Sequence, residues 1–592
     1  MARAGTKRLI AQARRALAGG NRSYALMLLR EAHDGAPKDA AAAVLLARVL
    51  LAHSGSGGHA MAAIEMLAAH LALNPRSAES ARKLSDILAS VTPVNFSRVD
   101  AAGLAAALRL DRVAADPLAR AAGLLLAERG EAPAFSRGTD EAALLTALLE
   151  AAPVREPGLE AWLVARRRTV LESMAEPAAE RDPAEQDEAL LAAMARQTWL
   201  NEGVWPVTDA ERKAVDRLDP ADPAHCFAAA LYLPAERWCP ADDRGDGDRL
   251  PKALAGLAGN IRRERHEMAR VDADLGPDVS AADRTGDAVA AQYEANPYPR
   301  WGWVQPPLAG AVRAFLDRIA GGSGGPQPDG GWTGGPLRIL IAGCGTGRQA
   351  VEAALAYAPN ARLLAFDFSR ASLRYAAMKA RRHRLDAIRF RQADILDLPD
   401  FEPPFDRPAD LIECIGVLHH MADPFAGWRI LLDRLRPGGL MYVGLYSATA
   451  RRGLTALRER LAAEGIDRAD PDAVRAVRAR ILAQTPDGPE DDFERGLADS
   501  ADFYTLSEVR DLLFHAHETP LTLEAIGEFL EGEGLEFLHM DVRPHIAEAF
   551  AASVNDGHGE SAALDLQAWA AFERDNPDTF DGMYLFWVRK PG

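Results

Sequence analysis

Residues 337–347 read Leu-Arg-Ile-Leu-Ile-Ala-Gly-Cys-Gly-Thr-Gly, and this stretch decides the fold of the chain. Its first half is a run of apolar and β-branched residues, which is typical of a buried strand. Its second half has glycine at every second position, and residues 348–357 after it are compatible with a helix. A strand, a tight turn and a helix in this order predict a parallel α/β sheet with a ligand site at the carboxyl end of the strand.

The turn contains Gly343, Gly345 and Gly347, which allow otherwise forbidden backbone angles and let a ligand lie on the main chain. Two kinds of ligand fit such a turn. The dinucleotide fingerprint G-x-G-x-x-G/A can be placed on Gly345, Gly347 and Ala350, but its first glycine should leave the strand directly. The glycine that does so is Gly343, and Arg348 then stands where a third small residue is needed. The register therefore favours a nucleoside ligand without a pyrophosphate.

Acidic residues end the next two apolar runs. The run 361–366 leads into Asp367, about twenty residues after the glycines, where a carboxylate can accept both hydroxyls of a ribose. The run 388–393 leads into Asp394 and Ile395, an acid and an apolar residue suited to the amino edge and the face of adenine. Both acids are expected at the same edge of the sheet as the glycine turn.

A fourth run, 409–414, leads into Gly-Val-Leu-His-His at 416–420, and a fifth, 440–446, follows Arg-Pro-Gly-Gly at 436–439. These five motifs, in this order and spacing, resemble the class I S-adenosylmethionine-dependent methyltransferases. The resemblance implies an α/β Rossmann-like domain with a seven-stranded sheet whose last strand is antiparallel, and S-adenosylmethionine as cofactor. The cofactor-binding residues it implies are Gly343, Cys344, Gly345, Gly347, Asp367, Phe368, Asp394 and Ile395.

Methyl transfer from a sulfonium requires alignment, desolvation and, for some acceptors, removal of a proton. His419 and His420 lie directly after the fourth run, where the resembled fold brings the acceptor and the methyl group together. An imidazole can take a proton near neutral pH, so we interpret both histidines as candidate catalytic residues. The alternative is that they cap or pack the strand-to-helix turn.

The resembled fold needs one more helix and two more strands after residue 446. The sequence predicts them at 523–533, 535–542 and 583–588, which makes residues 447–520 an insertion after the fifth strand. Because it starts at the ligand-binding edge, we expect the insertion to cap the acceptor pocket, with a mobile loop at 485–492. The candidate acceptor-binding residues in this part of the chain are Tyr446, Tyr504 and Arg510.

Residues 1–90 are rich in alanine and leucine at helical spacing. Three positions recur with a period slightly longer than the tetratricopeptide value of about 34 residues, Ala25, Ala32 and Pro37 recurring as Ala63, His70 and Pro75. We interpret this region as tetratricopeptide-like repeats that can dock a protein or peptide; the alternative is a helical array that only packs on its own enzyme domain. Residues 91–290 continue as an all-helical middle region, and residues 291–592 are expected to form the methyltransferase domain.

The segment 292–301, Gln-Tyr-Glu-Ala-Asn-Pro-Tyr-Pro-Arg-Trp, differs from everything before it. Its two prolines favour an extended chain, and Tyr293, Tyr298 and Trp301 give it an aromatic surface that can cover a ligand. Joined to helical repeats and a methyltransferase core, it resembles bacterial tetratricopeptide-repeat methyltransferases of unassigned substrate. We interpret the three aromatic residues as substrate-binding candidates; the alternative is a stiff strap between domains.

The chain has 592 residues and a net charge of −17, which argues against a dedicated nucleic-acid binder. Its four cysteines form no C-x-x-C pair, so we expect neither disulfides nor a metal site. Without a signal peptide or an apolar run of membrane-spanning length, a cytoplasmic protein with no membrane contact is expected. Two alternatives remain open: a catalytically silent scaffold that senses the cofactor, and a small-metabolite methyltransferase whose repeats are only structural.

Overall fold

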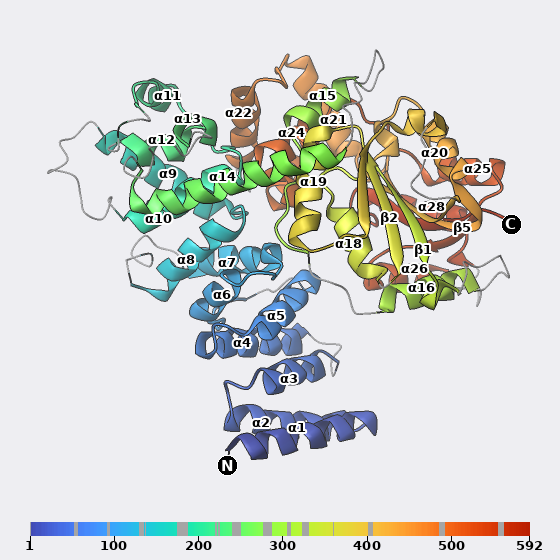
Figure 1. Ribbon diagram of the computed structural model, residues 1–592, viewed down its shortest axis with the longest axis horizontal. Helices are drawn as coiled ribbons and strands as arrows, with labels where there is room; N and C mark the ends of the chain where they lie inside the picture. Colours follow the sequence, from blue (N-terminus) through green and yellow to red (C-terminus); the bar gives the residue numbers. More distant parts are fainter. Residues whose placement is uncertain are drawn as a thin grey trace. The chain divides into compact units, whose positions relative to one another are not determined.

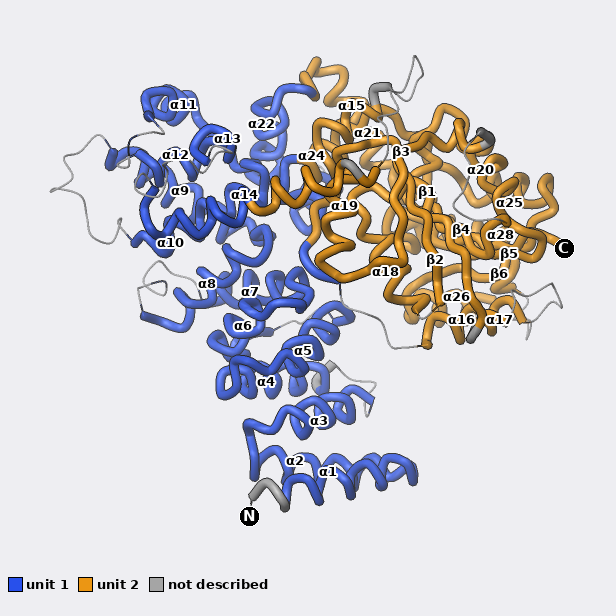
Figure 2. Tube along the Cα trace, viewed as in Figure 1, with its two compact units in different colours: residues 1–262, 302–305, 469–506 blue, residues 263–301, 306–468, 507–592 orange. Residues whose placement is uncertain are grey.

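The structure is a computed structural model of the chain, and Figure 2 shows its two compact units. Unit 1 contains residues 1–262, 302–305 and 469–506, and unit 2 contains residues 263–301, 306–468 and 507–592. Each unit is therefore built from three separate stretches of chain. The residues that the structure describes are 2–52, 57–91, 95–129, 135, 138–174, 187–219, 222, 225–239, 250–275, 287–304, 310–321, 331–358, 360–400, 407–484, 492–554 and 562–592.

Unit 2 contains a seven-stranded sheet with the strand order β3-β2-β1-β4-β5-β7-β6 (Figure 1). The first five strands pair in parallel, and β7 runs antiparallel to both β5 and β6. This topology confirms the fold class predicted from the sequence. The strands are β1 (Leu337–Ala342), β2 (Ala361–Asp367), β3 (Ile388–Gln392), β4 (Ala409–Ile415), β5 (Leu435–Tyr446), β6 (Glu536–Met540) and β7 (Met583–Arg589).

Alternate residues of the strands point to opposite faces of the sheet, and each face is covered by helices. On one face, strand residues such as Ile412 and Val443 join a core with Trp428 and Phe529 of the covering helices. The helices on this face are α20 (Pro424–Asp433), α25 (Leu523–Gly532), α26 (Pro544–Ser553) and α28 (Leu566–Asp575). The predicted helix and strands after residue 520 are confirmed, because α25, β6 and β7 lie within two residues of the expected bounds.

The other face is covered by α16 (Ala311–Gly321) and α18 (Arg348–Ala356). Phe315 of α16 packs edge-to-face on Trp587 of β7, with ring centroids 5.7 Å apart. Gln349 of α18 and Tyr357 behind it both donate to the buried carboxylate of Glu413 in β4, at 2.9 and 2.6 Å. These two hydrogen bonds offset the free-energy cost of burying a carboxylate inside the sheet.

Helix α19 (Arg370–Arg382) follows β2 and is held by a row of ion pairs to the end of α14 (Lys252–Asp272). Arg370 and Arg374 both donate to Asp272, at 2.8 and 2.6 Å, and Arg382 donates to Glu267 at 2.8 Å. The side chain of Arg370 is only 9% exposed, so its pair is the least screened of the three. The row fixes the N-terminus of α19, which lies directly after Asp367.

Every regular element in the described residues of unit 1 is a helix, and its first helices stack in two layers (Figure 1). Helices α3, α5, α7 and α9 follow one another in one layer, and α4, α6, α8, α10 and α12 in the other. The array continues past residue 90, and the assignment of residues 1–90 to tetratricopeptide repeats stays a prediction, as do the domain boundaries at 90 and 290. The helices are α1 (Ala2–Ala18), α2 (Arg22–Gly35), α3 (Ala40–Ala52), α4 (Gly57–Leu73), α5 (Ala78–Ser90), α6 (Ala101–Leu108), α7 (Ala115–Arg129), α8 (Asp140–Ala151), α9 (Pro157–Ser173), α10 (Glu188–Leu200), α11 (Asp209–Val215), α12 (Cys226–Tyr232) and α13 (Ala235–Trp238).

Two of these helices, α4 and α6, approach very closely. A Cβ atom at Gly103 of α6 would lie 1.9 Å from the carbonyl oxygen of Ala68 in α4, so only glycine fits there. Close backbone approach of this kind fixes how successive helices of the array stack. Among the described helices, none combines the length and the apolar character needed to cross a bilayer.

The insertion after β5 is not a single body. Its first part, with α21 (Arg452–Ala463), belongs to unit 2, whereas residues 469–506, with α22 (Pro471–Leu482) and α23 (Asp492–Gly496), belong to unit 1. The chain re-enters unit 2 within α24 (Leu506–Phe514). Apart from Asp492, the loop expected at 485–492 lies outside the described residues.

A buried ion pair ties the middle of the insertion into unit 1. Arg478 of α22 is fully buried and donates to both carboxylate oxygens of Glu160 in α9, at 2.6 and 2.7 Å. It also donates to the carbonyl of Phe503 at 2.6 Å. Burying two charges costs free energy, and the bidentate geometry of this pair offsets that cost. Helix α22 is therefore an integral part of the helical unit.

Candidate functional site

The glycine turn joins β1 to α18, and all three of its glycines have positive φ angles of 64°, 50° and 82°. A Cβ at Gly343 would lie 2.4 Å from a methyl group of Val417, and a Cβ at Gly347 would lie 2.4 Å from the Cβ of Ala376. At Gly345 the nearest described atom would be the carbonyl oxygen of Tyr298, at 3.4 Å. At Gly343 and Gly347 the absent Cβ therefore also makes room for the protein itself, and the close approach of a ligand to the turn stays a prediction.

Asp367 ends β2 beside this turn, as predicted, and is 7% exposed. One carboxylate oxygen accepts the N–H of Gly345 and the other accepts the N–H of Ser369, both at 2.8 Å. Burial raises the pKa of Asp367 to about 6, and these backbone donors oppose the rise. A carboxylate has about four lone-pair sites, so acceptor capacity remains for the two hydroxyls of a ribose. A buried carboxylate with free acceptor capacity therefore fits the ribose of the nucleoside that the sequence predicts.

The other predicted cofactor residues lie at the same edge but differ in exposure. Phe368 and Asp394 are partly exposed, and Asp394 accepts the N–H of Leu396 at 2.9 Å. Ile395 is buried in the core and Cys344 is buried beside Asp367, where burial raises the pKa of the thiol well above its ordinary value. Cys344 is therefore a packing residue of the turn with a neutral thiol.

Residues 292–301, which we call the strap, are bonded directly to the glycine turn. The hydroxyl of Thr346 in the turn donates to the carbonyl of Pro299, and the indole N–H of Trp301 donates to the carbonyl of Thr346 at 3.0 Å. The hydroxyl of Tyr375 in α19 donates to the carbonyl of Trp301 at 2.9 Å. Trp301 is 6% exposed, so it anchors the strap rather than presenting a free aromatic face.

Tyr293 at the other end of the strap faces a different set of residues. Its hydroxyl donates to Asp511 at 2.8 Å and lies 3.2 Å from the ring Nε2 of His515. Its carbonyl accepts the hydroxyl of Ser369 at 3.2 Å, two residues after Asp367. Burial, and then the charge of Asp511, raise the pKa of Tyr293 well above its ordinary value, so the phenol stays protonated. The strap thus connects the cofactor turn with the residues around His515.

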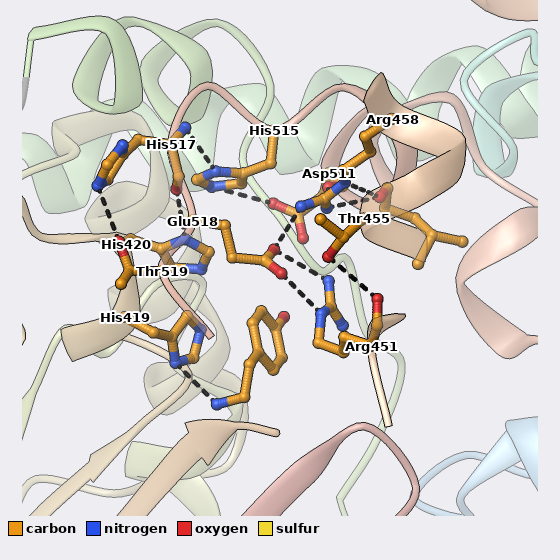
Figure 3. A network of polar contacts seen from close by, with 12 residues as sticks. His419, His420, Arg451, Thr455, Arg458, Asp511, His515, His517, Glu518 and Thr519 are labelled. Carbon is orange, nitrogen blue, oxygen red and sulfur yellow. Dashed lines mark hydrogen bonds and ion pairs between the residues drawn. The ribbon is translucent and has the colours of Figure 1, made fainter. Parts of the chain in front are cut away.

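Figure 3 shows His419, His420 and His515 in one column, which we call the histidine column. The rings of His420 and His515 stack with centroids 3.9 Å apart, and those of His419 and His420 meet at an angle with centroids 4.3 Å apart. His419 and His420 follow β4, whereas His515 follows α24 at the end of the insertion. Only the first two were predicted as candidates for catalysis.

The hydrogen bonds of the column fix which ring nitrogens carry hydrogen. In His515, Nδ1 accepts the N–H of His517 at 3.1 Å, so Nε2 carries the hydrogen and donates to Tyr293. In His419, Nδ1 accepts the N–H of Tyr446 at 3.3 Å, so Nε2–H is the donor. In His420 the arrangement is reversed, because Nδ1–H donates to the carbonyl of His517 at 3.0 Å and Nε2 keeps its lone pair.

All three imidazoles are neutral at neutral pH. Burial lowers the pKa of His420 and of His515 to about 4, and it lowers the pKa of His419 well below its ordinary value. The neighbouring Arg451 contributes to the lowering at His419, and Asp511 opposes it at His420. The described residues contain no cluster of three or more histidine, cysteine or acidic side chains placed to hold a metal ion.

The charged residues beside the column are paired with one another (Figure 3). Glu518 accepts from Arg451 at 2.7 Å and from Arg458 at 2.6 Å. Arg451 also covers the ring of Tyr446 at 3.6 Å, and His419 stacks on the same ring with centroids 3.8 Å apart. Tyr446 is thus brought to the column, and its role in binding the acceptor stays a prediction.

Two other predicted acceptor residues are engaged elsewhere. Tyr504 belongs to unit 1, is 1% exposed and donates to the carbonyl of Ala498 at 2.5 Å. Arg510 donates to Asn296 of the strap and to the carbonyl of Arg468. The sequence reasoning missed the pairing of Arg451 and Arg458 with Glu518. The seven-residue spacing of the two arginines, which puts them on one helix face, was the available signal.

The chain shares its motif region with a known family. A family described as "Methyltransferase domain" matches residues 336–469, which include the glycine turn, Asp367 and both histidines after β4. This part of the chain is a methyltransferase domain. S-adenosylmethionine is its cofactor, in agreement with the nucleoside predicted from the register of the glycines.

More distant relatives cover less than the whole molecule. The chain is 29% identical over 275 residues to an uncharacterized protein of Synechococcus, syc1184_c, in a match that spans 43% of this chain and 60% of the relative. A solved structure of PKMT2 from Rickettsia typhi in complex with AdoHcy is 17% identical, with a TM-score of 0.34, over 46% of this chain and 52% of that one. A putative methyltransferase from Bacillus halodurans is 16% identical, with a TM-score of 0.24, over 48% of this chain and 100% of that one.

Proposed function

We propose that the whole chain transfers a methyl group from S-adenosylmethionine to an acceptor that lies against the histidine column. The bound cofactor supplies an activated methyl group on its sulfonium. The residues of this chain then have three tasks, which are to hold the nucleoside, to align the acceptor and to take up a proton. Gly345 and Asp367 serve the first task, and the strap and the column serve the other two.

The observation that carries the proposal is the state of His420. Its Nδ1–H is held by the carbonyl of His517, so the ring is oriented and Nε2 keeps a lone pair. No partner of Nε2 is found among the described residues. A neutral, oriented imidazole at the carboxyl end of β4 is the arrangement expected of a proton acceptor. A histidine that only packs needs neither a fixed ring orientation nor a free lone pair on Nε2.

Binding and turnover together test this function. Calorimetry with S-adenosylmethionine, S-adenosylhomocysteine and NADH should show binding of both sulfur nucleosides and none of NADH. Mass spectrometry of an extract of the source organism, incubated with the protein and methyl-labelled cofactor, should then show transferred label. Binding without any transfer would favour the alternative function, a scaffold that senses the cofactor. Binding of NADH alone would overturn both.

The helical array of unit 1 is proposed as the surface that holds a protein or peptide acceptor, and the identity of its repeats belongs to this proposal. Tyr24 and Met27 of α2 favour it, because these large apolar side chains are 46% and 54% exposed. Tyr24→Ser combined with Met27→Ser should weaken transfer to protein acceptors and leave the affinity for cofactor unchanged. Equal turnover of the double variant would instead favour a small-metabolite acceptor and purely structural helices.

A further inference from the structure

The histidine column leaves two ring nitrogens of opposite character without a partner among the described residues. Nε2–H of His419 is a donor, and it is buried without an acceptor. Nε2 of His420 is an acceptor whose ring is already oriented from the other side. A buried donor left unpaired costs about 1–3 kcal/mol, so such a group is expected to meet its partner in the functional state.

The two rings lie close together, and we infer from this that their Nε2 atoms can serve one small group. The rings of His419 and His420 are 4.3 Å apart between centroids and inclined by 64°. Each is fixed by a backbone bond, His419 to Tyr446 and His420 to His517, so neither ring can turn over without losing that bond. The pair therefore presents a fixed donor beside a fixed acceptor.

This pairing selects among the groups that accept methyl. A carboxylate can accept from His419 but has no hydrogen for His420. An ammonium can donate to His420 but has no lone pair for His419. A thioether has no hydrogen, and an aromatic carbon can do neither. A hydroxyl and an uncharged amine can do both.

The charges beside the column decide between the last two groups. An amine is mostly an ammonium ion at neutral pH, and a buried ammonium needs a net negative charge beside it. The charged groups beside the column balance instead, because Arg451 and Arg458 offset Glu518 and Asp511. The two arginines also lower the pKa of His419, which means that they disfavour positive charge at that position. A hydroxyl brings no charge into this environment.

We propose that the acceptor group is a hydroxyl, bound between His419 and His420, and that the protein is an O-methyltransferase. This inference rests on the proposed function and deepens it. The hydroxyl oxygen accepts from Nε2–H of His419 and donates to Nε2 of His420. The bond between the oxygen and the methyl carbon forms as the sulfur–methyl bond breaks, with its electron pair staying on sulfur. The hydroxyl proton goes to Nε2 of His420, and the products are a methyl ether and the neutral thioether.

The linkage of the transferred methyl group tests the proposal directly. Full-length protein is incubated with methyl-labelled S-adenosylmethionine and an extract of the source organism, and labelled products are separated into linkage classes. A methyl ether survives mild base and carries no added positive charge at neutral pH, which is the result expected. Label released as methanol by mild base marks a carboxylate acceptor, and label retained on a cation exchanger marks an amine; either result overturns the proposal.

Two matched variants show whether the column performs this transfer. Asparagine can reproduce the Nδ1 position of histidine but lacks an atom at Nε2. His420→Asn keeps a donor for the carbonyl of His517 and His419→Asn keeps an acceptor for the N–H of Tyr446, while each loses the proposed contact. We expect turnover to fall by about 10²–10⁴-fold in His420→Asn and by about 10-fold or more in His419→Asn.

The affinity for S-adenosylhomocysteine, measured by calorimetry, should change less than about twofold in both variants and thereby report an intact fold. Full turnover by His420→Asn would overturn the inference and leave the methyltransferase assignment standing. Absence of label transfer by the wild type, with cofactor bound, would overturn the proposed function itself. The two failures are therefore distinguishable.

Discussion

The proposed cofactor side and the proposed acceptor side of unit 2 are built in different ways. The cofactor side consists of one strand, one turn and the end of the neighbouring strand, and its main polar contact joins Gly345 to Asp367. The acceptor side gathers Tyr293, His420, Arg451 and His515 from four separate segments. The first is specified by local backbone geometry, whereas the second depends on how the insertion leaves and re-enters unit 2.

This difference implies that cofactor binding and turnover should be lost through separate substitutions. Damage to the glycine turn should abolish cofactor binding, and damage to the path of the insertion should abolish turnover while cofactor binding persists. The strap is the exception, because Thr346 and His515 both bond to it, at Pro299 and at Tyr293. Substitutions that remove the buried anchor of the insertion, the glycine packing or the ribose acceptor test how far the separation holds.

The largest effect is expected at the buried pair of Arg478 and Glu160. Arg478→Met leaves an uncompensated carboxylate in the interior of unit 1 and should destabilise it by about 3–5 kcal/mol. Hydrogen exchange in α9 and α22 should speed up accordingly. Turnover should fall, because residues 469–506 join the two parts of the insertion that supply Arg451 and His515, whereas affinity for S-adenosylhomocysteine should persist.

The matched control is the double variant Arg478→Met with Glu160→Leu. It replaces both charges by apolar groups and should recover most of the lost stability, since buried ion pairs are often replaceable in this way. If the single and the double variant are equally unstable, the contribution of Arg478 is packing and not the ion pair.

The second effect concerns the glycine turn. Gly347→Ala places a methyl group 2.4 Å from the Cβ of Ala376 at a φ of 82°, so overpacking and backbone strain together should cost about 2–5 kcal/mol of stability. Gly345→Ala is the control, since its nearest described contact is 3.4 Å away and only the strain of its φ remains. Thermal unfolding should separate the two variants. Equal losses would show that strain alone sets the cost.

The comparison of the two glycines also shows where sequence reasoning reaches its limit. The strand, the turn and Asp367 could be predicted because each is a local pattern with a fixed backbone consequence. The reason for Gly343 and Gly347 could not, because Val417 and Ala376 come from other elements and only the fold brings them to the turn. The sequence therefore predicted the elements of this turn but not the packing role of Gly343 and Gly347, and the cofactor contacts of its residues stay a prediction.

The proposed acceptor side was predictable only in part. His419 and His420 follow a recognisable strand, and Tyr446 ends the next one, so their meeting follows from the sheet order. The approach of His515 does not, since it depends on an excursion through unit 1 that no periodicity in residues 447–520 signals. The packing of Tyr504 into the helical unit was unpredictable for the same reason, because an aromatic residue within a predicted cap gives no indication of it.

The third effect is on cofactor affinity alone. Asp367→Ala removes the proposed ribose acceptor and should weaken binding of S-adenosylhomocysteine by about 1.5–3 kcal/mol, or roughly 10- to 100-fold. It also removes the partner of the Gly345 and Ser369 N–H groups, so part of the loss reflects the turn itself. Asp394→Ala is the comparison, because Asp394 is more exposed and holds a single local N–H. Calorimetry that finds Asp394→Ala weaker than Asp367→Ala would assign the principal contact to the adenine side.

The smallest effect is a dependence of cofactor binding on pH, and its sign follows from the burial of Asp367. The pKa of this group is about 6 in the folded protein, raised from 3.8 by burial. Ribose hydroxyls donate to the ionised form, so the cofactor binds that form better and releases a proton on binding below pH 6. Affinity should therefore rise with pH up to about 6 and then level off. At pH 5 about one tenth of Asp367 is ionised, which predicts roughly tenfold weaker binding than at pH 7, or about 1.4 kcal/mol.

Titrations of S-adenosylhomocysteine at pH 5, 6, 7 and 7.5 measure this dependence directly. Asp367→Asn should give a flat profile over the same range, because the amide does not titrate. An equally flat profile of the wild type would mean that the Asp367 carboxylate binds only the N–H groups of Gly345 and Ser369 and does not contact the cofactor. Asp367 would then stabilise the turn itself, as the packing of Gly343 and Gly347 does.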